Sequence, residues 1–131
     1  MTREILLVDD DEDDAALFGV AAEAVGIRYG VRAARSGEEA LDLLVGQGYT
    51  PALVLLDVKM PGIDGMETLR RLRAARPSGE ILVAMLTGSD LERDKAEATS
   101  LGCDLFLTKP PSLAGYYEMA DKIKKLLPEP G

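Results

Sequence analysis

The sequence predicts an α/β fold of the doubly wound class, in which a parallel sheet is covered by helices on both faces. Short apolar runs alternate with helix-like stretches five times along the chain, which is typical of β/α units. Two of the runs, residues 5–8 and 52–56, are apolar without interruption, as expected for strands buried on both faces. Right-handed crossovers then favour a five-stranded sheet in the order 2-1-3-4-5.

The individual elements follow from apolar runs and helix-capping signals. Strands are predicted at residues 5–8, 29–34, 52–56, 81–86 and 105–108. Three helices open with a capping box, in which an N-cap side chain and a glutamate three residues later satisfy the first N–H groups. These pairs are Ser36 with Glu39, Asp64 with Glu67 and Ser89 with Glu92, and Ser112 caps the last helix. Helix ends are predicted at Gly26, near Gly46 and Gly48, before Pro77, at Gly102 and before Pro128.

Apolar residues at helical spacing predict the face that each helix turns toward the sheet. The predicted inward residues are Leu17, Val20, Ala21 and Ala24 in the first helix, Leu41, Leu44 and Val45 in the second, Met66, Leu69 and Leu72 in the third, and Ala120, Ile123 and Leu127 in the last.

The composition limits the domain count, the compartment and the kinds of partner. A chain of 131 residues with 47% hydrophobic residues fits one domain, which we place at residues 1–127 with a tail at 128–131. The single cysteine, Cys103, cannot form an internal disulfide, and no 18-residue apolar run or signal-like N-terminus occurs. A reducing, cytoplasmic setting is therefore favoured. The net charge of −8 disfavours direct binding to nucleic acid or to anionic membranes.

Polar residues follow four of the predicted strands at the point where each strand ends. Asp9 and Asp10 follow the first strand, Asp57 the third, Thr87 the fourth and Lys109 the fifth. In the order 2-1-3-4-5 these four strands lie side by side, so their carboxyl ends meet at one edge of the sheet, where ligands of such sheets bind. The sequence therefore predicts a polar site at this edge.

Three clustered carboxylates predict a divalent cation in that site. Asp9, Asp10 and Asp57 repel one another, and Mg²⁺ prefers oxygen ligands of this kind. An EF-hand calcium loop starting at Asp9 is excluded, because its glycine and glutamate positions hold Asp14 and Val20. Most of the acids at residues 11–14 are interpreted as a solvated helix start favoured by the helix dipole.

The remaining polar residues suit phosphoryl chemistry. The chain contains no histidine, which excludes histidine-based acid/base catalysis, histidine metal ligands and a phosphohistidine of its own. A carboxylate such as that of Asp57 can form an acyl phosphate when the phosphoryl oxygens are neutralised and aligned. The ammonium of Lys109 can neutralise one phosphoryl oxygen, and the hydroxyl of Thr87 can donate to another.

These residues stand in four motifs that resemble the receiver domain of two-component response regulators, over essentially the whole chain. The motifs are Val8-Asp9-Asp10, Leu56-Asp57 with Met60-Pro61-Gly62-Ile63-Asp64-Gly65, Leu86-Thr87-Gly88 and Thr108-Lys109-Pro110. The resemblance implies a flavodoxin-like, three-layer fold and a signalling domain rather than an enzyme, whose chemistry is limited to its own phosphorylation and dephosphorylation.

The resemblance also implies a role for each site residue. Asp57 is the expected phosphoacceptor, and Mg²⁺, or Mn²⁺ in its place, is the expected cofactor. Asp10, Asp57 and the main-chain carbonyl of Lys59 are expected to bind the cation directly, and Asp9 through water.

The other implied roles concern the phosphoryl group and the switch. Thr87 is expected to be the switch hydroxyl and Lys109 the phosphate partner, with a cis Lys109–Pro110 peptide that aims the lysine. Gly88 is expected to leave the pocket open. Phe106 occupies the switch-aromatic position, where tyrosine is also usual, and it cannot make the hydroxyl hydrogen bond of a tyrosine.

The partners implied by the resemblance are proteins. A sensor histidine kinase or a histidine phosphotransfer protein would donate the phosphoryl group, and a downstream protein would receive the signal. Similar receivers also form homodimers through the surface made by the helix at 90–101, the strand at 105–108 and the helix at 112–127. Because no room for an effector domain follows residue 127, output is expected to pass through protein contacts.

Three alternatives remain beside this interpretation. A phosphatase or phosphotransferase resembling the haloacid dehalogenases would need an aspartate two residues after the nucleophile, where this chain has Lys59. A flavin-binding module of the flavodoxin type would place an anionic phosphate against the acidic run at residues 9–14. A degenerate receiver would bind partners without phosphorylation, but no acceptor or metal position is missing.

Overall fold

The computed structural model describes residues 3–76, 80–88 and 92–128 and confirms the doubly wound fold. Five parallel strands form one sheet in the order β2-β1-β3-β4-β5. The strands are β1 (Glu4–Val8), β2 (Gly30–Ala34), β3 (Leu53–Asp57), β4 (Leu82–Thr87) and β5 (Leu105–Thr108).

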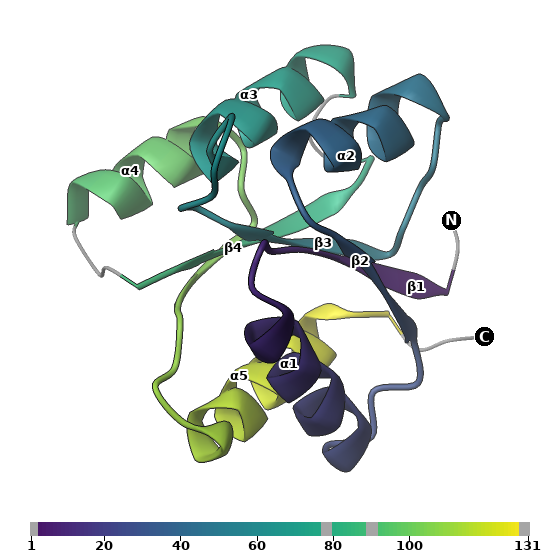
Figure 1. Cartoon of the computed structure of the whole chain (residues 1–131), viewed down its shortest axis with the longest axis vertical. Helices are drawn as coiled ribbons and strands as arrows, with labels where there is room; N and C mark the ends of the chain where they lie inside the picture. Colours follow the sequence, from purple (N-terminus) through teal and green to yellow (C-terminus); the bar gives the residue numbers. More distant parts are fainter. Residues whose placement is uncertain (1–2, 77–79, 89–91, 129–131) are drawn as a thin grey trace.

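Helices cover both faces of the sheet and produce a three-layer arrangement (Figure 1). In Figure 1, α1 and α5 lie below the sheet, and α2, α3 and α4 lie above it. The helices are α1 (Glu12–Ala24), α2 (Gly37–Leu41) continued by a π-helical turn η1 (Asp42–Gly46), α3 (Gly65–Ala75), α4 (Glu92–Ser100) and α5 (Leu113–Leu126). The predicted fourth helix begins at Asp90, which lies outside the described residues.

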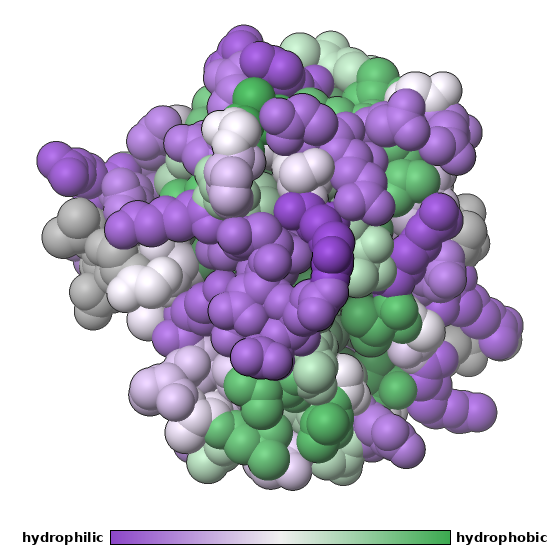
Figure 2. Space-filling model, viewed as in Figure 1, coloured by the Kyte–Doolittle hydropathy of each residue, from purple (hydrophilic) through white to green (hydrophobic). Residues whose placement is uncertain are grey.

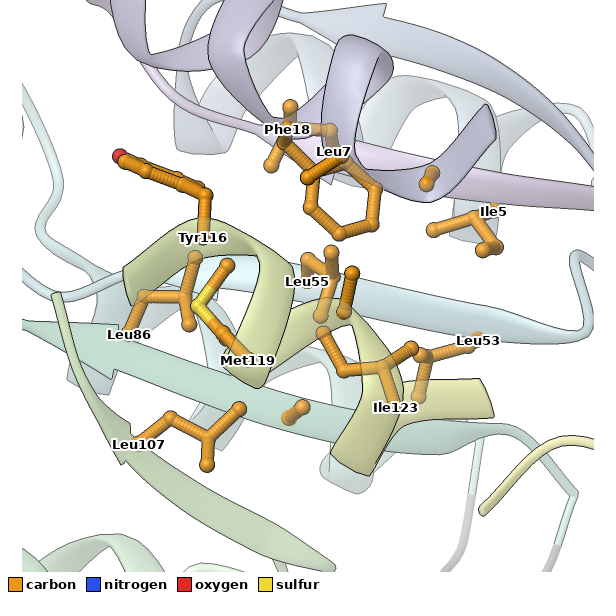
Figure 3. Close-up of a cluster of buried hydrophobic side chains, with 14 of the residues drawn as sticks. Ile5, Leu7, Phe18, Leu53, Leu55, Leu86, Leu107, Tyr116, Met119 and Ile123 are labelled. Carbon is orange, nitrogen blue, oxygen red and sulfur yellow. The ribbon is translucent and has the colours of Figure 1, made fainter. Parts of the chain in front are cut away.

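Alternate residues of the strands supply two hydrophobic cores, one on each face. Leu7 and Leu55 pack against α1 and α5 on one face, whereas Val8 and Leu56 pack against α2 and α3 on the other. Figure 3 shows the first core, to which α1 contributes Phe18 and α5 contributes Met119. Because both faces are filled, the central strands are uniformly apolar, as the sequence predicts.

The predicted helix caps are present, but the reciprocal half of each described capping box is not. The side chains of Ser36 and Asp64 accept from the N–H groups three residues later, at 3.0 and 2.9 Å. Glu39 accepts instead from the N–H of Arg35, at 2.8 Å, and Glu67 binds arginines of its own helix. The predicted pair Ser89 and Glu92 involves a residue outside the described ones.

The predicted inward faces of the first two helices are wrong in part. Ala21 and Leu44 are buried as predicted, and Leu17 and Leu41 pack against the cores, but Val20, Ala24 and Val45 are exposed. α1 buries Phe18, Ala21 and Ala22, while Val20 is 52% exposed. Apolar residues surround this helix, so spacing alone does not select a face, and the ring of Phe18 fills the space beside α5. The second helix buries Leu43 and Leu44 and exposes Val45, with Ala40 as the inward residue one turn earlier.

The predicted inward faces of the third and fifth helices are confirmed. Met66, Leu69 and Leu72 of α3 and Ala120 and Ile123 of α5 are buried, and Leu127, which follows α5, is half-buried.

A buried arginine joins α3 to the loop that follows α4. The Nε and Nη2 groups of Arg73 donate to the carbonyl oxygen of Gly102, at 3.1 and 2.9 Å. Nη2 also lies 3.3 Å from a carboxylate oxygen of Asp104, which in turn accepts from the N–H of Val83 at 2.9 Å. The guanidinium therefore ties the end of α4 to α3 and to the sheet.

The surface seen in Figure 2 is divided between polar and apolar regions. A band of polar side chains crosses the middle of this face, and apolar side chains gather below it, over α1 and α5. The most exposed large apolar residues include Val20 of α1 and Leu113 and Tyr117 of α5. Among the described helices, none has the length and apolar content needed to span a bilayer.

Candidate functional site

The strand register brings the predicted site residues to one edge of the sheet. Asp57, the last residue of β3, pairs with Leu86 of β4, and Thr87 pairs with Thr108 of β5. Hydrogen bonds continue this pairing past the strand ends: the N–H of Lys109 donates to Thr87 at 2.6 Å. The residues that follow β1, β3, β4 and β5 therefore meet at the carboxyl edge, as the sequence predicts.

Three carboxylates form a cluster at this edge. One oxygen of each of Asp9, Asp10 and Asp57 lies within 4.8 Å of the others. Asp9 and Asp57 are each 5% exposed, whereas Asp10 is exposed. Asp9 is held by the backbone, because one of its oxygens accepts from the N–H of Asp11 at 2.9 Å. The cluster thus has two buried members and one that faces solvent.

The ammonium of Lys109 is surrounded by carboxylates. Its Nζ lies 3.1 Å from Asp9, 3.2 Å from Asp57 and 2.8 Å from Asp14. Lys109 enters from the residue after β5, so it reaches across β4 to the end of β3. Its position matches that expected for a group that neutralises a phosphoryl oxygen on Asp57.

The predicted cis peptide between Lys109 and Pro110 is wrong for this structure. No cis peptide bond occurs in the described parts of the chain, and this bond is among them. The trans isomer is the more stable one for most bonds that precede proline. With the trans bond, Lys109 already contacts Asp57 at 3.2 Å.

The electrostatics of the site disfavour a bare charge on Asp57. Burial raises the pKa of Asp57 to about 6, and the neighbouring Asp9 adds to this, although Lys109 and the N–H of Lys59 lower it. Burial also disfavours the charged form of Lys109, but hydrogen bonds to Asp14 and Asp9 outweigh it and hold the pKa of Lys109 above its ordinary value. Three carboxylates, those of Asp9, Asp14 and Asp57, therefore share one ammonium.

The donor set fits a hard divalent cation. Carboxylate oxygens are the ligands that Mg²⁺ prefers, and the clustered oxygens of Asp9, Asp10 and Asp57 lie close enough to share one ion. The positive charge of such an ion would reduce the repulsion among these carboxylates, which the single charge of Lys109 does not fully offset. Lys59, whose carbonyl is the fourth predicted ligand, is exposed in the loop after β3, and its N–H donates to Asp57.

The predicted switch residues surround the cluster on the β4 and β5 side. Thr87 is 1% exposed at the end of β4. A Cβ placed on Gly88 would meet no described atom within 4 Å, so space is open beside the site there. Phe106 is half-buried and packs against the core on the α3 and α4 face. These positions suit the predicted roles, which remain predictions.

Asp14 is the site residue that the sequence interpretation missed. The acidic run from Asp11 was assigned to solvent, and the structure confirms this for Asp11 and Asp13, which are exposed. Asp14 is half-buried in the first turn of α1 and contacts Lys109. The sequence carried no local signal for this role, because Asp14 stands in a run of six acids.

A doubly wound sheet with an acidic cluster, a threonine and a lysine at its carboxyl edge is the arrangement expected of a receiver domain. The family model for the response regulator receiver domain matches residues 5–121. The chain belongs to the response regulator receiver domain family.

Solved structures of response regulators are similar to this chain over nearly its whole length. The phosphorylated cyanobacterial phytochrome response regulator RcpA is 26% identical, with a TM-score of 0.84 over 97% of this chain and 94% of that one. The Mn²⁺-bound form of response regulator Rcp1 is 28% identical, with a TM-score of 0.83 over 98% and 96% of the two chains. The bacteriophytochrome response regulator AtBRR is 34% identical, with a TM-score of 0.75 over 100% and 98%.

Proposed function

We propose that this chain is a phosphorelay response regulator that accepts a phosphoryl group on Asp57. The observation that carries the proposal is the environment of that carboxylate. It is buried at the end of β3, shares a cation-sized cluster with Asp9 and Asp10, and lies 3.2 Å from the ammonium of Lys109. The similarity to the phosphorylated RcpA and to the Mn²⁺-bound Rcp1 supports it.

Each site residue has a role in this proposal. Asp10, Asp57 and the main-chain carbonyl of Lys59 hold Mg²⁺ directly, Asp9 holds it through water, and Mn²⁺ can replace it. The cation, when bound, neutralises oxygens of the phosphoryl group.

The phosphoryl transfer places one oxygen of Asp57 on the phosphorus of a phosphohistidine. The O–P bond forms, the P–N bond breaks, and its electron pair remains on the imidazole nitrogen. Lys109 donates to one phosphoryl oxygen and Thr87 to another, and both groups are already held at the sheet edge in the free protein. Hydrolysis of the acyl phosphate returns Asp57 to a carboxylate.

Output then passes through protein contacts. We assign residues 1–127 to the receiver and residues 128–131 to a tail. A sensor histidine kinase or a phosphotransfer protein donates the phosphoryl group. A downstream protein or a second copy of the chain binds the surface of α4, β5 and α5. This surface borders the site through Thr87 and Lys109, so it is the part best placed to respond to phosphorylation.

The test is the intact mass of the protein after mixing with a small acyl phosphate. We expect a gain of one phosphoryl group in the presence of Mg²⁺ and none after the cation is removed with a chelator, because the acidic cluster would then repel the anionic donor. Adding Mn²⁺ back should restore the gain. No gain under any of these conditions would contradict the proposal.

Metal binding should distinguish the two halves of the acidic run. Asp10→Ala is expected to weaken Mg²⁺ binding by about tenfold or more, because it removes a direct ligand. Asp13→Ala removes the same charge from an exposed position and should have a much smaller effect. Calorimetric titration of both variants measures the difference, and equal losses would mean that the whole run binds the cation.

Thr87 should couple the phosphoryl group to the output surface. Thr87→Ala is expected to accept phosphate roughly tenfold more slowly, because one donor to the phosphoryl group is lost. The variant should also lose the inward turn of Phe106, which would fill the space that the threonine vacates. Amide hydrogen exchange across residues 88–127, with and without a phosphoryl analogue, measures this coupling. An identical response in the variant and the parent protein would show that Thr87 does not carry it.

A further inference from the structure

We propose that Asp14 is a positioning residue for Lys109, and that the hydroxyl of Tyr116 holds Asp14 in place. This inference rests on the proposed function, since Lys109 acts there on the phosphoryl group. It adds two residues, one from α1 and one from α5, to the machinery around Asp57.

The contacts form a chain of three groups. One oxygen of Asp14 lies 2.8 Å from the ammonium of Lys109, closer than Asp9 at 3.1 Å or Asp57 at 3.2 Å. The other oxygen of Asp14 accepts from the hydroxyl of Tyr116 at 3.2 Å. Each oxygen of the Asp14 carboxylate thus has its own donor. Two such contacts fix the orientation of the carboxylate, whereas one hydrogen bond would allow it to rotate.

Tyr116 is itself fixed by the core. Its side chain is 2% exposed, and Figure 3 shows its ring beside Leu86 and Met119, with the hydroxyl at the edge of the cluster. Burial and the charge of Asp14 raise the pKa of the Tyr116 hydroxyl, so it remains protonated and donates to Asp14 at neutral pH. The chain of contacts therefore runs from the buried core at Tyr116 to the ammonium of Lys109.

Anchoring matters because a lysine side chain is flexible. Its four-carbon stem carries up to about 2 kcal/mol of rotamer entropy, and its ammonium has three donors. The three carboxylates Asp9, Asp14 and Asp57 can use all three of them. When a phosphoryl oxygen takes the place of Asp57, Asp9 and Asp14 still hold the ammonium in position, so its ordering does not have to occur during the transfer.

The test compares variants that are matched in charge and in shape. Asp14→Asn and Asp13→Asn each remove one negative charge from the first turn of α1, but only Asp14 contacts Lys109. Tyr116→Phe removes the hydroxyl that holds Asp14 and keeps the ring in the core. Tyr29→Phe is its control, because the Tyr29 hydroxyl donates to the carbonyl of Pro128 instead. Thermal unfolding checks that each variant is folded.

The first measurement is the rate constant of phosphorylation at saturating acyl phosphate and Mg²⁺. We expect it to fall about tenfold in Asp14→Asn and about threefold in Tyr116→Phe, and to stay unchanged in Asp13→Asn and Tyr29→Phe. Each aspartate variant loses one negative charge, which should change the acyl phosphate concentration that gives half of the maximal rate. This change should be the same in Asp14→Asn and Asp13→Asn. Equal rate constants in Asp14→Asn and Asp13→Asn would overturn the proposal.

The second measurement needs neither cation nor phosphate. The ammonium NMR signal of Lys109, identified by its loss in Lys109→Arg, should be visible in the free protein because three carboxylates slow its exchange with water. It should broaden or disappear in Asp14→Asn and persist in Asp13→Asn. An unchanged signal in Asp14→Asn would overturn the positioning role, even if phosphorylation slows. A parent protein that shows the signal but never gains phosphate would contradict the proposed function alone.

Discussion

Asp57→Asn is expected to abolish the gain of a phosphoryl group in the intact protein. The amide that replaces the carboxylate is a much weaker nucleophile and a weaker ligand for a hard cation. The shape of the side chain is kept, so the packing at the end of β3 should not change. Intact-mass measurement with acyl phosphate and Mg²⁺ tests the variant beside the parent protein. A mass gain that persists in the variant would place the acceptor elsewhere.

The same substitution should make the metal-free protein more stable at neutral pH. The pKa of Asp57 is raised from 3.8 to about 6 in the folded state, so its ionisation opposes folding in part between pH 3.8 and 6 and fully above pH 6. This cost is on the order of 3 kcal/mol at pH 7.5 and shrinks to about 1 kcal/mol near pH 4.5, as the folded protein takes up the proton before the unfolded chain does. Asparagine cannot ionise, so the Asp57→Asn variant does not have this cost.

Urea unfolding of both proteins at the two pH values, with a chelator present, measures the difference. A gain in stability that is equal at pH 7.5 and pH 4.5 would contradict the assignment of a raised pKa to Asp57. A stable, folded variant would also show that the loss of phosphorylation is not a loss of structure.

Gly65→Ala is expected to damage both the fold and the site. Gly65 is the first residue of α3, and its N–H donates to the carbonyl of Val58 at 2.8 Å. A Cβ at this position would lie 2.3 Å from the carbonyl oxygen of Asp57 and 2.8 Å from the Cα of Val58. Both are backbone atoms that cannot rotate away, so either α3 or the loop after Asp57 must move.

The expected cost of Gly65→Ala is about 3 kcal/mol in the free energy of unfolding, at the upper end for overpacking. Gly19→Ala is the matched control, because Gly19 lies within α1 and a Cβ there would meet no described atom within 4 Å. The control should gain about 0.5 to 1 kcal/mol, since alanine favours a helix. If urea unfolding gave the two variants equal stability, the close approach of α3 to Asp57 would not restrict the size of the side chain at residue 65.

The order of the strands was predictable because it depends on features that are local in the sequence. Uninterrupted apolar runs mark buried strands, and the crossover rule then arranges them. The positions of Asp9, Asp57, Thr87 and Lys109 follow from that order alone, since each is the last residue of a strand or the one directly after it. Their convergence therefore needed no knowledge of side-chain packing.

The helix faces and the role of Asp14 were not predictable in this way. α1 carries apolar residues on most of its surface, so the choice of Phe18 over Leu17 depends on how its ring fits against α5. Asp14 stands in a run of six acids, and only the position of Lys109 separates it from its exposed neighbours. The structure has the trans form of the peptide bond before Pro110, and the sequence alone does not decide this isomer.

The arginine that ties α3 to the end of α4 holds one end of α4 in place. Gly102, whose carbonyl Arg73 binds, takes a left-handed conformation with φ of 95°, and its N–H donates to Thr99 at 3.0 Å. Among the described residues of α4, only Ala98, near this end, is buried. Among its described residues, α4 is thus anchored at its C-terminal end, while Glu92 and Arg93 at the other end are exposed. A partner that binds at Glu92 and Arg93 would therefore contact the end of α4 that Arg73 does not hold.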